Sequence, residues 1–139
     1  MGARRKSREL ALQMLFQHDL SGNSPSAILT TFEDLQKAKA PVRDFAVKIF
    51  EGTLRHLEEI DGMITHQAEN WRLSRMAVVD LNIIRMSIYE FLHENDTPKL
   101  VIIDEAIEIG KKFGTDKSSQ FINGILDGVL KKYNLQETN

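Results

Sequence analysis

The sequence predicts an all-α protein, and three observations support that fold class. Apolar residues recur three or four positions apart through nearly the whole chain, which is helical spacing. Proline and small polar residues interrupt the pattern where one helix would end and the next begin. Glycine accounts for only 8 of 139 residues, and no short hairpin signal separates alternating apolar runs. Strand-like stretches such as residues 100–103 lie inside helical periodicity, so we expect no sheet.

Two helices are expected before residue 40. The first extends over about residues 4–19, where apolar residues form one stripe and its immediate neighbours. Residues 21–23 read Ser-Gly-Asn, a turn composition. Ser24 and Pro25 then supply an N-cap and a first-turn proline for a second helix, which runs through Ile28, Leu29, Phe32 and Leu35.

The middle of the chain predicts two longer helices. After the Ala-Pro pair at residues 40–41, one helical pattern continues over residues 45–64. Gly52 lies inside it and indicates a close packing contact or a bend. Residues 78–92 form the most apolar helix of the set, which we expect to be central. The chain is predicted to be one domain, with a division near Trp71 into subdomains 1–71 and 72–139.

Two more helices complete the prediction. Residues 96–98 read Asp-Thr-Pro, which starts a helix that Gly114 ends. Asp116 or Ser118 is expected to cap the last helix, which continues to Tyr133.

Composition excludes several classes of protein. Hydrophobic residues make up 42% and charged residues 27% of the chain, which argues against disorder. There is no cysteine, so neither a disulfide framework nor a thiolate metal site can form. No apolar run approaches the ~20 residues that a membrane-spanning helix needs, and the basic start is not followed by a cleavage site. We therefore expect a cytoplasmic protein with no membrane partner.

The distribution of charge is more informative than the net charge of -2. Four of the 18 basic residues lie within the first eight positions, where there is no acidic residue. The rest of the chain carries a balance of -6. A cationic end on an acidic body is the asymmetry expected of a protein that meets a polyanion at one place.

A search for reactive chemistry finds no catalytic site, no metal site and no cofactor motif. The histidines His18, His56, His66 and His93 are scattered, and no two of them have the i, i+4 spacing of a helical zinc site. His56 and Glu59 read as an ordinary pair on a helix surface. Phosphate loops, nucleophile elbows and dinucleotide fingerprints are absent from the sequence. We therefore expect a protein that is not an enzyme.

The cationic start is the one segment that suggests a ligand. Arginine binds RNA through phosphates and by stacking its planar guanidinium on unpaired bases. Cations at a helix start oppose the helix dipole, so this segment breaks a local rule. From spacing alone, two interpretations stay open: an RNA-binding segment, or a solvated N-terminus with no ligand. The basic residues concerned are Arg4, Arg5, Lys6 and Arg8.

Three separate motifs resemble the NusB family of transcription antitermination proteins. The basic start runs into Gln13 and Phe16, as in the N-terminal signature of that family. Residues 79–90 are similar to its central helix. Residues 105–127, which include Lys-Phe-Gly and Phe-Ile-Asn-Gly-Ile-Leu-Asp, resemble its C-terminal signature. The resemblance runs nearly end to end, and the order and spacing of the motifs make it specific.

This resemblance implies two small helical bundles with six to seven helices, and a function without catalysis or cofactor. NusB proteins bind the boxA element of nascent ribosomal RNA leaders together with NusE, a protein of the small ribosomal subunit. The complex acts on RNA polymerase and suppresses premature termination. We therefore expect boxA RNA, NusE and the RNA polymerase antitermination complex as partners.

The resemblance also implies site residues. Phe121 could stack on a base or pack in the core, and Asp80 and Arg85 could face NusE or form internal salt bridges; these alternatives stay open. RNA contacts are expected from the basic start and from a second patch: Arg4, Arg5, Lys6, Arg8, Lys112, Lys117, Phe121 and Asn123. NusE contacts are expected from Phe16, Asp80 and Arg85.

Two rival classes remain. NusB-like domains also occur at the N-terminus of certain ribosomal RNA cytosine methyltransferases, although this chain has no cofactor-binding α/β portion. The second rival is a structural helical protein that forms a homodimer through an apolar face, for which Phe16, Phe32 and Phe50 are candidates. A homodimer could also coexist with RNA binding by covering the basic surface.

Overall fold

The structure, a computed structural model, describes residues 2–68 and 72–135. Within these ranges the chain forms eight α-helices and one short 3-10 helix, and no strand occurs. The all-α prediction is confirmed. The helices group into two compact units, Met1–Arg55 (unit 1) and His56–Asn139 (unit 2).

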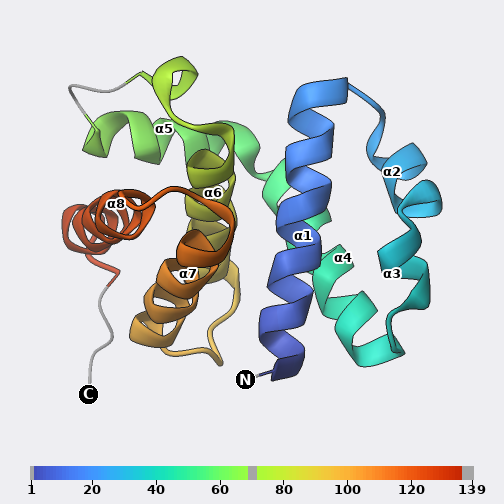
Figure 1. Cartoon of the computed structure of the whole chain (residues 1–139). Helices are drawn as coiled ribbons and strands as arrows, with labels where there is room; N and C mark the ends of the chain where they lie inside the picture. The colour runs from blue at the N-terminus through green and yellow to red at the C-terminus, as the bar shows by residue number, and fades with distance from the viewer. Residues whose placement is uncertain (1, 69–71, 136–139) are drawn as a thin grey trace. The chain divides into compact units, whose positions relative to one another are not determined.

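Unit 1 is built around its first and last helices, which pack along each other (Figure 1). The side chains of Leu10, Met14, Ile28, Ile49 and Phe50 are fully buried. The four-residue spacing of Leu10 and Met14 on α1 is the pattern that predicted helix here. The four helices are α1 (Gly2–Ser21), α2 (Pro25–Thr31), α3 (Glu33–Lys37) and α4 (Ala40–Arg55).

The start of the second predicted helix is confirmed, but its extent is wrong. Ser24 is the N-cap of α2, and its hydroxyl accepts a hydrogen bond from the backbone N–H of Ala27 at 3.2 Å. Phe32 then adopts an extended backbone (φ -74°, ψ 104°), which ends α2 and begins α3. Apolar spacing continues across this residue, so periodicity alone could not reveal the break.

The prediction of one long helix over residues 45–64 is also wrong, because two helices cover this range. α4 ends at Arg55 and α5 (Leu57–Gln67) begins two residues later. His56 lies between them with φ -106° and ψ 18°, outside the helical region. Of the two alternatives for Gly52, the bend occurs four residues later, at His56, and Gly52 itself is buried within α4.

Unit 2 is organised around α6 (Val78–His93), which contacts α5, α7 (Lys99–Phe113) and α8 (Ser118–Lys132). Figure 1 shows the three neighbours arranged around it. Residues 80–91 are all buried, so the prediction of a central helix is confirmed. The 3-10 helix η1 (Leu73–Arg75) precedes α6 and contacts α5.

Two glycines allow α7 and α8 to approach closely. A Cβ on Gly110 would lie 2.8 Å from Cδ1 of Ile122, and a Cβ on Gly114 would overlap the Ser118 hydroxyl. Gly114 ends α7 as predicted. The predicted cap of α8 is wrong: Lys117 is the N-cap and makes no side-chain cap bond. The Ser118 hydroxyl instead accepts a hydrogen bond from the backbone N–H of Thr115 at 2.8 Å.

The compact units divide after Arg55. The predicted division near residue 71 falls within unit 2, and Trp71 itself lies outside the described residues. Among the residues that the structure describes, no helix has the length and apolar character needed to cross a membrane.

Candidate nucleic-acid interface

The basic start of the chain forms part of α1, and two of its arginines lie over an aromatic ring of α4. The guanidinium carbon of Arg4 is 3.8 Å from the ring centroid of Phe45, and that of Arg8 is 5.7 Å away. Between them, the Ser7 hydroxyl donates to the backbone carbonyl of Val42 at 2.8 Å. These contacts hold the first turns of α1 against α4.

The four basic residues differ in exposure. Arg4 and Lys6 are exposed, and Arg5 is half-buried. Arg8 is only 3% exposed, so most of its side chain is out of reach of a ligand in this structure. The segment therefore offers a ligand chiefly Arg4, Arg5 and Lys6, while Arg8 packs within the fold.

Lys6 has basic neighbours that sequence reasoning missed. A shallow pocket of about 320 Å³ is lined by Lys6, Lys37 and Lys39, together with Asp34, Ala38 and Val42. Lys37 also pairs with Glu33 at 3.2 Å, an exposed contact of one helical turn. The two added lysines are distant from the start of the chain in sequence, and only the turn between α3 and α4 brings them to Lys6.

Unit 2 contains a larger open pocket of about 660 Å³, within the size range of ligand sites in proteins. Three elements supply its walls: η1 with the turn that follows it, the first turn of α6, and the start of α8. Its lining residues are Arg75, Met76, Ala77, Asp80, Lys117, Gln120 and Phe121. Three of the predicted site residues, Asp80, Lys117 and Phe121, therefore meet in one pocket.

The groups in this pocket are suited to a nucleotide. Phe121 is half-buried, so part of its ring can pack against the fold while the exposed part stacks on a base. Lys117 and Arg75 are exposed cations. Asp80 is 8% exposed, and its Oδ1 is buried without a hydrogen-bond partner among the described residues. It lies in the first turn of α6, where backbone N–H groups lack partners within the helix. A buried acceptor without a donor is costly, so a ligand N–H there would be stabilised.

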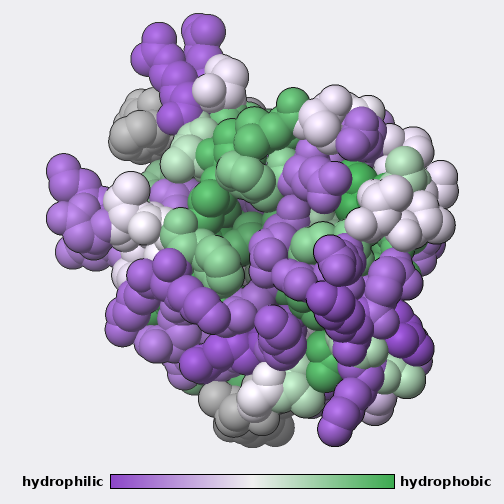
Figure 2. Space-filling model, turned by 45° about the vertical axis from the view of Figure 1, so that its right-hand side comes forward, coloured by the Kyte–Doolittle hydropathy of each residue, from purple (hydrophilic) through white to green (hydrophobic). Residues whose placement is uncertain are grey.

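The remaining predicted contacts lie outside this pocket. Asn123 and Lys112 are exposed on α8 and α7, and the Lys112 ammonium is 5.3 Å from the ring centroid of Phe113. Phe16 is half-buried on α1. Figure 2 shows one face of the protein, on which hydrophobic residues gather in one area in the upper middle and hydrophilic residues cover most of the lower part.

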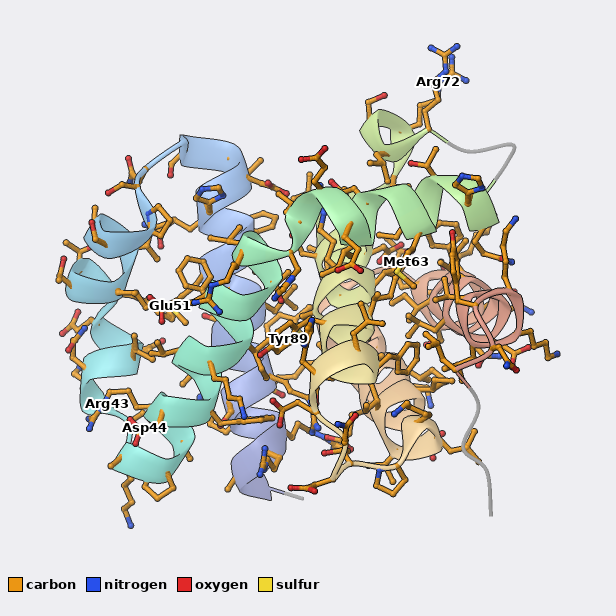
Figure 3. All side chains as sticks on the ribbon, turned by 180° about the vertical axis from the view of Figure 1, so that it is seen from behind. Arg43, Asp44, Glu51, Met63, Arg72 and Tyr89 are labelled. Carbon is orange, nitrogen blue, oxygen red and sulfur yellow. The ribbon has the colours of Figure 1, made fainter. Side chains whose placement is uncertain are left out.

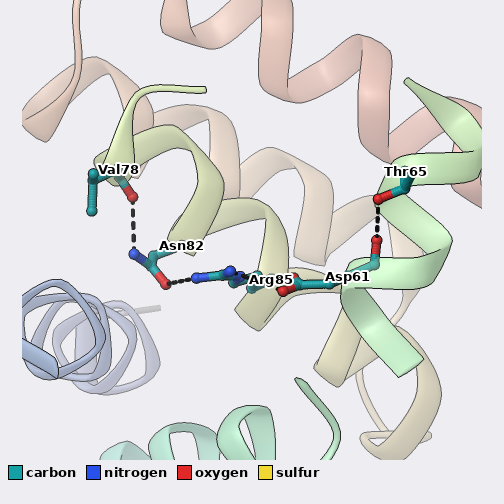
Figure 4. Close-up of polar contacts among 5 residues, drawn as sticks. All are labelled: Asp61, Thr65, Val78, Asn82 and Arg85. Atoms are coloured by element: carbon teal, nitrogen blue, oxygen red, sulfur yellow. Dashed lines mark hydrogen bonds and ion pairs between the residues drawn. The ribbon is translucent and has the colours of Figure 1, made fainter. Parts of the chain in front are cut away.

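Arg85 is engaged within unit 2. Its Nε and one Nη atom donate to the two carboxylate oxygens of Asp61 on α5, at 2.8 and 2.9 Å (Figure 4). The other Nη donates to the side chain of Asn82 at 3.2 Å. Side-chain exposures of 9% for Arg85 and 21% for Asp61 show that the pair is largely removed from solvent. This geometry supports the internal salt bridge, the alternative to a partner contact.

Two histidines that are distant in sequence lie together in unit 2. The rings of His56 and His93 stack with centroids 4.3 Å apart, and His93 also stacks on Tyr89, which is labelled on α6 in Figure 3. Glu59 lies 3.8 Å from Nδ1 of His56. Partial burial lowers the pKa of His93 below 6.5, with a contribution from His56, while Glu59 and Glu94 oppose the shift.

Taken together, the fold and the two surfaces define a small all-helical protein with cationic and aromatic sites of the kind that nucleic-acid-binding proteins use. The family model described as the NusB family matches residues 5–131. The chain belongs to the NusB family, and the resemblance found in its motifs is confirmed.

Individual relatives agree over almost their full length. The transcription antitermination protein NusB of Geobacter sulfurreducens is 48% identical over 130 residues, covering 93% of this chain and 94% of that protein. The structure of T. maritima NusB matches with a TM-score of 0.85 at 38% identity, over 93% of this chain and 91% of that chain. A chain in a crystal structure of antitermination factors NusB and NusE with dsRNA has a TM-score of 0.86 at 25% identity, covering 96% and 99%.

Proposed function

We propose that this protein is a transcription antitermination factor that binds the boxA element of nascent ribosomal RNA leaders together with NusE. In this proposal the complex acts on RNA polymerase elongation complexes in the cytoplasm, and the protein is a scaffold without catalytic activity. The end-to-end match to antitermination proteins supports this function over that of a methyltransferase domain. A relative structure in complex with NusE and dsRNA supports the two kinds of partner.

The observation that carries the proposal is the pocket of unit 2. An unpaired base would stack on Phe121, a contact worth about 1–3 kcal/mol per base in single-strand binding. Lys117 and Arg75 would neutralise the adjacent phosphates. The carboxylate of Asp80 would accept a hydrogen bond from an amino or imino N–H of the base. This assigns Asp80 to RNA, whereas the family resemblance implied a contact with NusE and left an internal salt bridge open as the alternative.

The basic surface of unit 1 would supply further phosphate contacts. Arg4, Arg5 and Lys6 are the members of the predicted segment that a ligand can reach, and Lys37 and Lys39 extend the surface. Arg8 would act by holding the start of α1 against Phe45. Lys112 and Asn123 would contact RNA outside the pocket, and Phe16 stays our candidate for a NusE contact.

A fluorescence-anisotropy titration tests the proposal. Labelled boxA RNA and a scrambled RNA of equal length are each titrated with the protein, with and without purified NusE. We expect preference for boxA, and stronger binding when NusE is present. Equal weak binding to both RNAs with no response to NusE would contradict the proposal.

An Asp80→Asn variant in the same titration separates the two assignments of Asp80. Weaker binding to boxA RNA without NusE would support the RNA contact. An unchanged RNA affinity with weaker NusE binding would restore the prediction made from the sequence.

A homodimer that covers the basic surface stays a prediction. Light scattering over the working concentration range measures it directly. A monomer at every concentration would contradict it.

A further inference from the structure

We propose that His56, Glu59 and His93 form a binding site for a divalent transition-metal ion, with Zn²⁺ as the best-suited ion. All three residues belong to unit 2. They lie outside both candidate RNA surfaces, so the inference does not depend on the proposed function.

The three side chains converge from two helices. His56 is the N-cap residue of α5, and Glu59 lies in the first turn of the same helix. His93 is the last residue of α6, a helix that packs against α5. One potential ligand atom from each residue lies within 4.8 Å of the other two. Two imidazoles and one carboxylate are thus presented together, although 37 positions separate the two histidines.

This donor set is one that zinc uses. Two histidines and one glutamate, with water in the fourth position, is an established tetrahedral arrangement of Zn²⁺ in proteins. Imidazole also binds nickel, copper and cobalt, whereas calcium and magnesium prefer sites made of oxygen ligands. The mixed nitrogen and oxygen set therefore selects transition metals over the hard cations.

The distances require only a small adjustment. Zinc–ligand bonds of about 2.1 Å place the ligand atoms of a tetrahedral site roughly 3.4 Å apart. No separation between these ligand atoms exceeds 4.8 Å, so each must close by at most about 1.4 Å, which rotation of exposed side chains provides. Glu59 is 60% exposed and His56 31% exposed, so both can move. The histidine rings stack at 27° with centroids 4.3 Å apart, and because a metal ion lies in the plane of each imidazole that binds it, the two rings must rotate apart to share one ion.

The local charges favour a cation. Glu59 is one of the ligands, and Glu94 lies close enough to influence His93 electrostatically. The last turn of α6 presents its carbonyl end, where the helix dipole favours positive charge and opposes the contrary effect of the start of α5. Because the ligands come from two helices, a bound ion would cross-link the start of α5 to the end of α6.

The test uses the full chain, without a histidine affinity tag, in the absence of RNA. Zn²⁺ is titrated into the metal-free protein by calorimetry, and Co²⁺ binding is followed by visible absorption, which reports tetrahedral coordination. We expect one ion per chain. His93→Asn and His56→Asn should each weaken binding at least about tenfold, and Glu59→Gln should weaken it less.

His66→Asn is the matched control. His66 is an exposed histidine on α5 outside the cluster, so its loss should leave the affinity unchanged. Imidazole NMR resonances of His56 and His93, and not those of His18 or His66, should respond to one equivalent of Zn²⁺. The proposal is overturned if no saturable binding occurs. It is equally overturned if His93→Asn binds like the parent protein, or if His66→Asn loses as much affinity as His93→Asn.

Discussion

Arg85 is a charged side chain on the central helix of unit 2, and it donates hydrogen bonds to other residues of that unit. Both oxygens of Asp61 accept from its guanidinium, and Asn82 accepts from the remaining edge. Asn82 in turn donates to the carbonyl of Val78 at 2.9 Å, so the arginine ends a short polar chain along α6. A bidentate pair of this kind fixes orientation as well as charge.

Removing this guanidinium should therefore destabilise unit 2. We expect Arg85→Ala to lower the free energy of unfolding by about 2 kcal/mol, because it leaves the Asp61 carboxylate largely buried without its cation. Urea denaturation measures the change. Arg85→Lys keeps the charge but not the paired geometry, and should lose an intermediate amount. If Arg85→Ala weakened NusE binding and left unfolding unchanged, the residue would be a partner contact instead.

Two substitutions separate the stacking of the Phe121 ring from the apolar volume of the side chain. Phe121→Ala should weaken boxA RNA binding by roughly 5- to 100-fold, the effect of losing one stacked base. Phe121→Leu retains apolar volume and removes the π-face, so it should lose most of the same affinity. Anisotropy titrations measure both variants, and circular dichroism checks their folding. If the leucine variant bound RNA as the parent does, apolar packing would replace stacking as the role of Phe121.

The family resemblance implied candidate site residues but could not decide their roles. Asp80, Lys117 and Phe121 were among them, and the structure brings these three into one pocket. Motif spacing gave no indication that Arg85 pairs with Asp61, 24 positions away, or that His93 reaches His56. Such pairs depend on how helices pack, and helical periodicity describes only one face of one helix at a time.

At the scale of elements, the contact between α7 and α8 depends on residues without side chains. Gly110 and Gly114 lie where Ile122 and Ser118 approach the backbone of α7. The Lys-Phe-Gly and Phe-Ile-Asn-Gly motifs therefore have a packing role in addition to any ligand role.

Alanine at Gly114 should be destabilising, while alanine at another helical glycine should not. We expect Gly114→Ala to lower the free energy of unfolding by about 1–3 kcal/mol, because its Cβ would overlap Ser118. Gly62 in α5 is the control, since a Cβ there meets no atom within 4 Å. Gly62→Ala should raise stability by up to about 1 kcal/mol through helix propensity. Thermal and urea unfolding measure both, and equal effects would contradict the packing argument.

Element types were predictable, while two breaks between elements were not. Ser24-Pro25 and Gly114 marked helix ends correctly because capping chemistry is local. The breaks at Phe32 and His56 carry no proline or glycine, and apolar spacing continues through them. Local composition and periodicity therefore do not reveal them.

At the scale of the whole molecule, the charge asymmetry seen in the sequence becomes two cationic surfaces on an acidic chain. Counterion release makes such binding depend on salt, with a slope of log affinity against log salt of about -0.7 per phosphate on single strands. The number of cations that contact RNA can therefore be measured without a structure of the complex.

An Arg4→Ala/Lys6→Ala variant should make this slope shallower by about 1.4, because two phosphate contacts are lost. Binding should also be weaker at every salt concentration. Lys131→Ala is the control, since Lys131 pairs with Asp127 at 2.9 Å and belongs to neither surface. Titrations at several salt concentrations provide the slopes. An unchanged slope in the double variant would remove the start of α1 from the RNA interface.

The position of α8 has a consequence for how the protein is made. α8 covers α5, α6 and α7, and Gly128 leaves room for the Gln67 side chain near the end of α5. On the ribosome these three helices are synthesised first, so the apolar faces that α8 covers stay exposed until α8 has been synthesised. Unit 1 consists of earlier, contiguous sequence and can acquire its structure during that interval. Ribosome stalling just before α8 would therefore leave a nascent chain in which the apolar faces that α8 covers stay exposed.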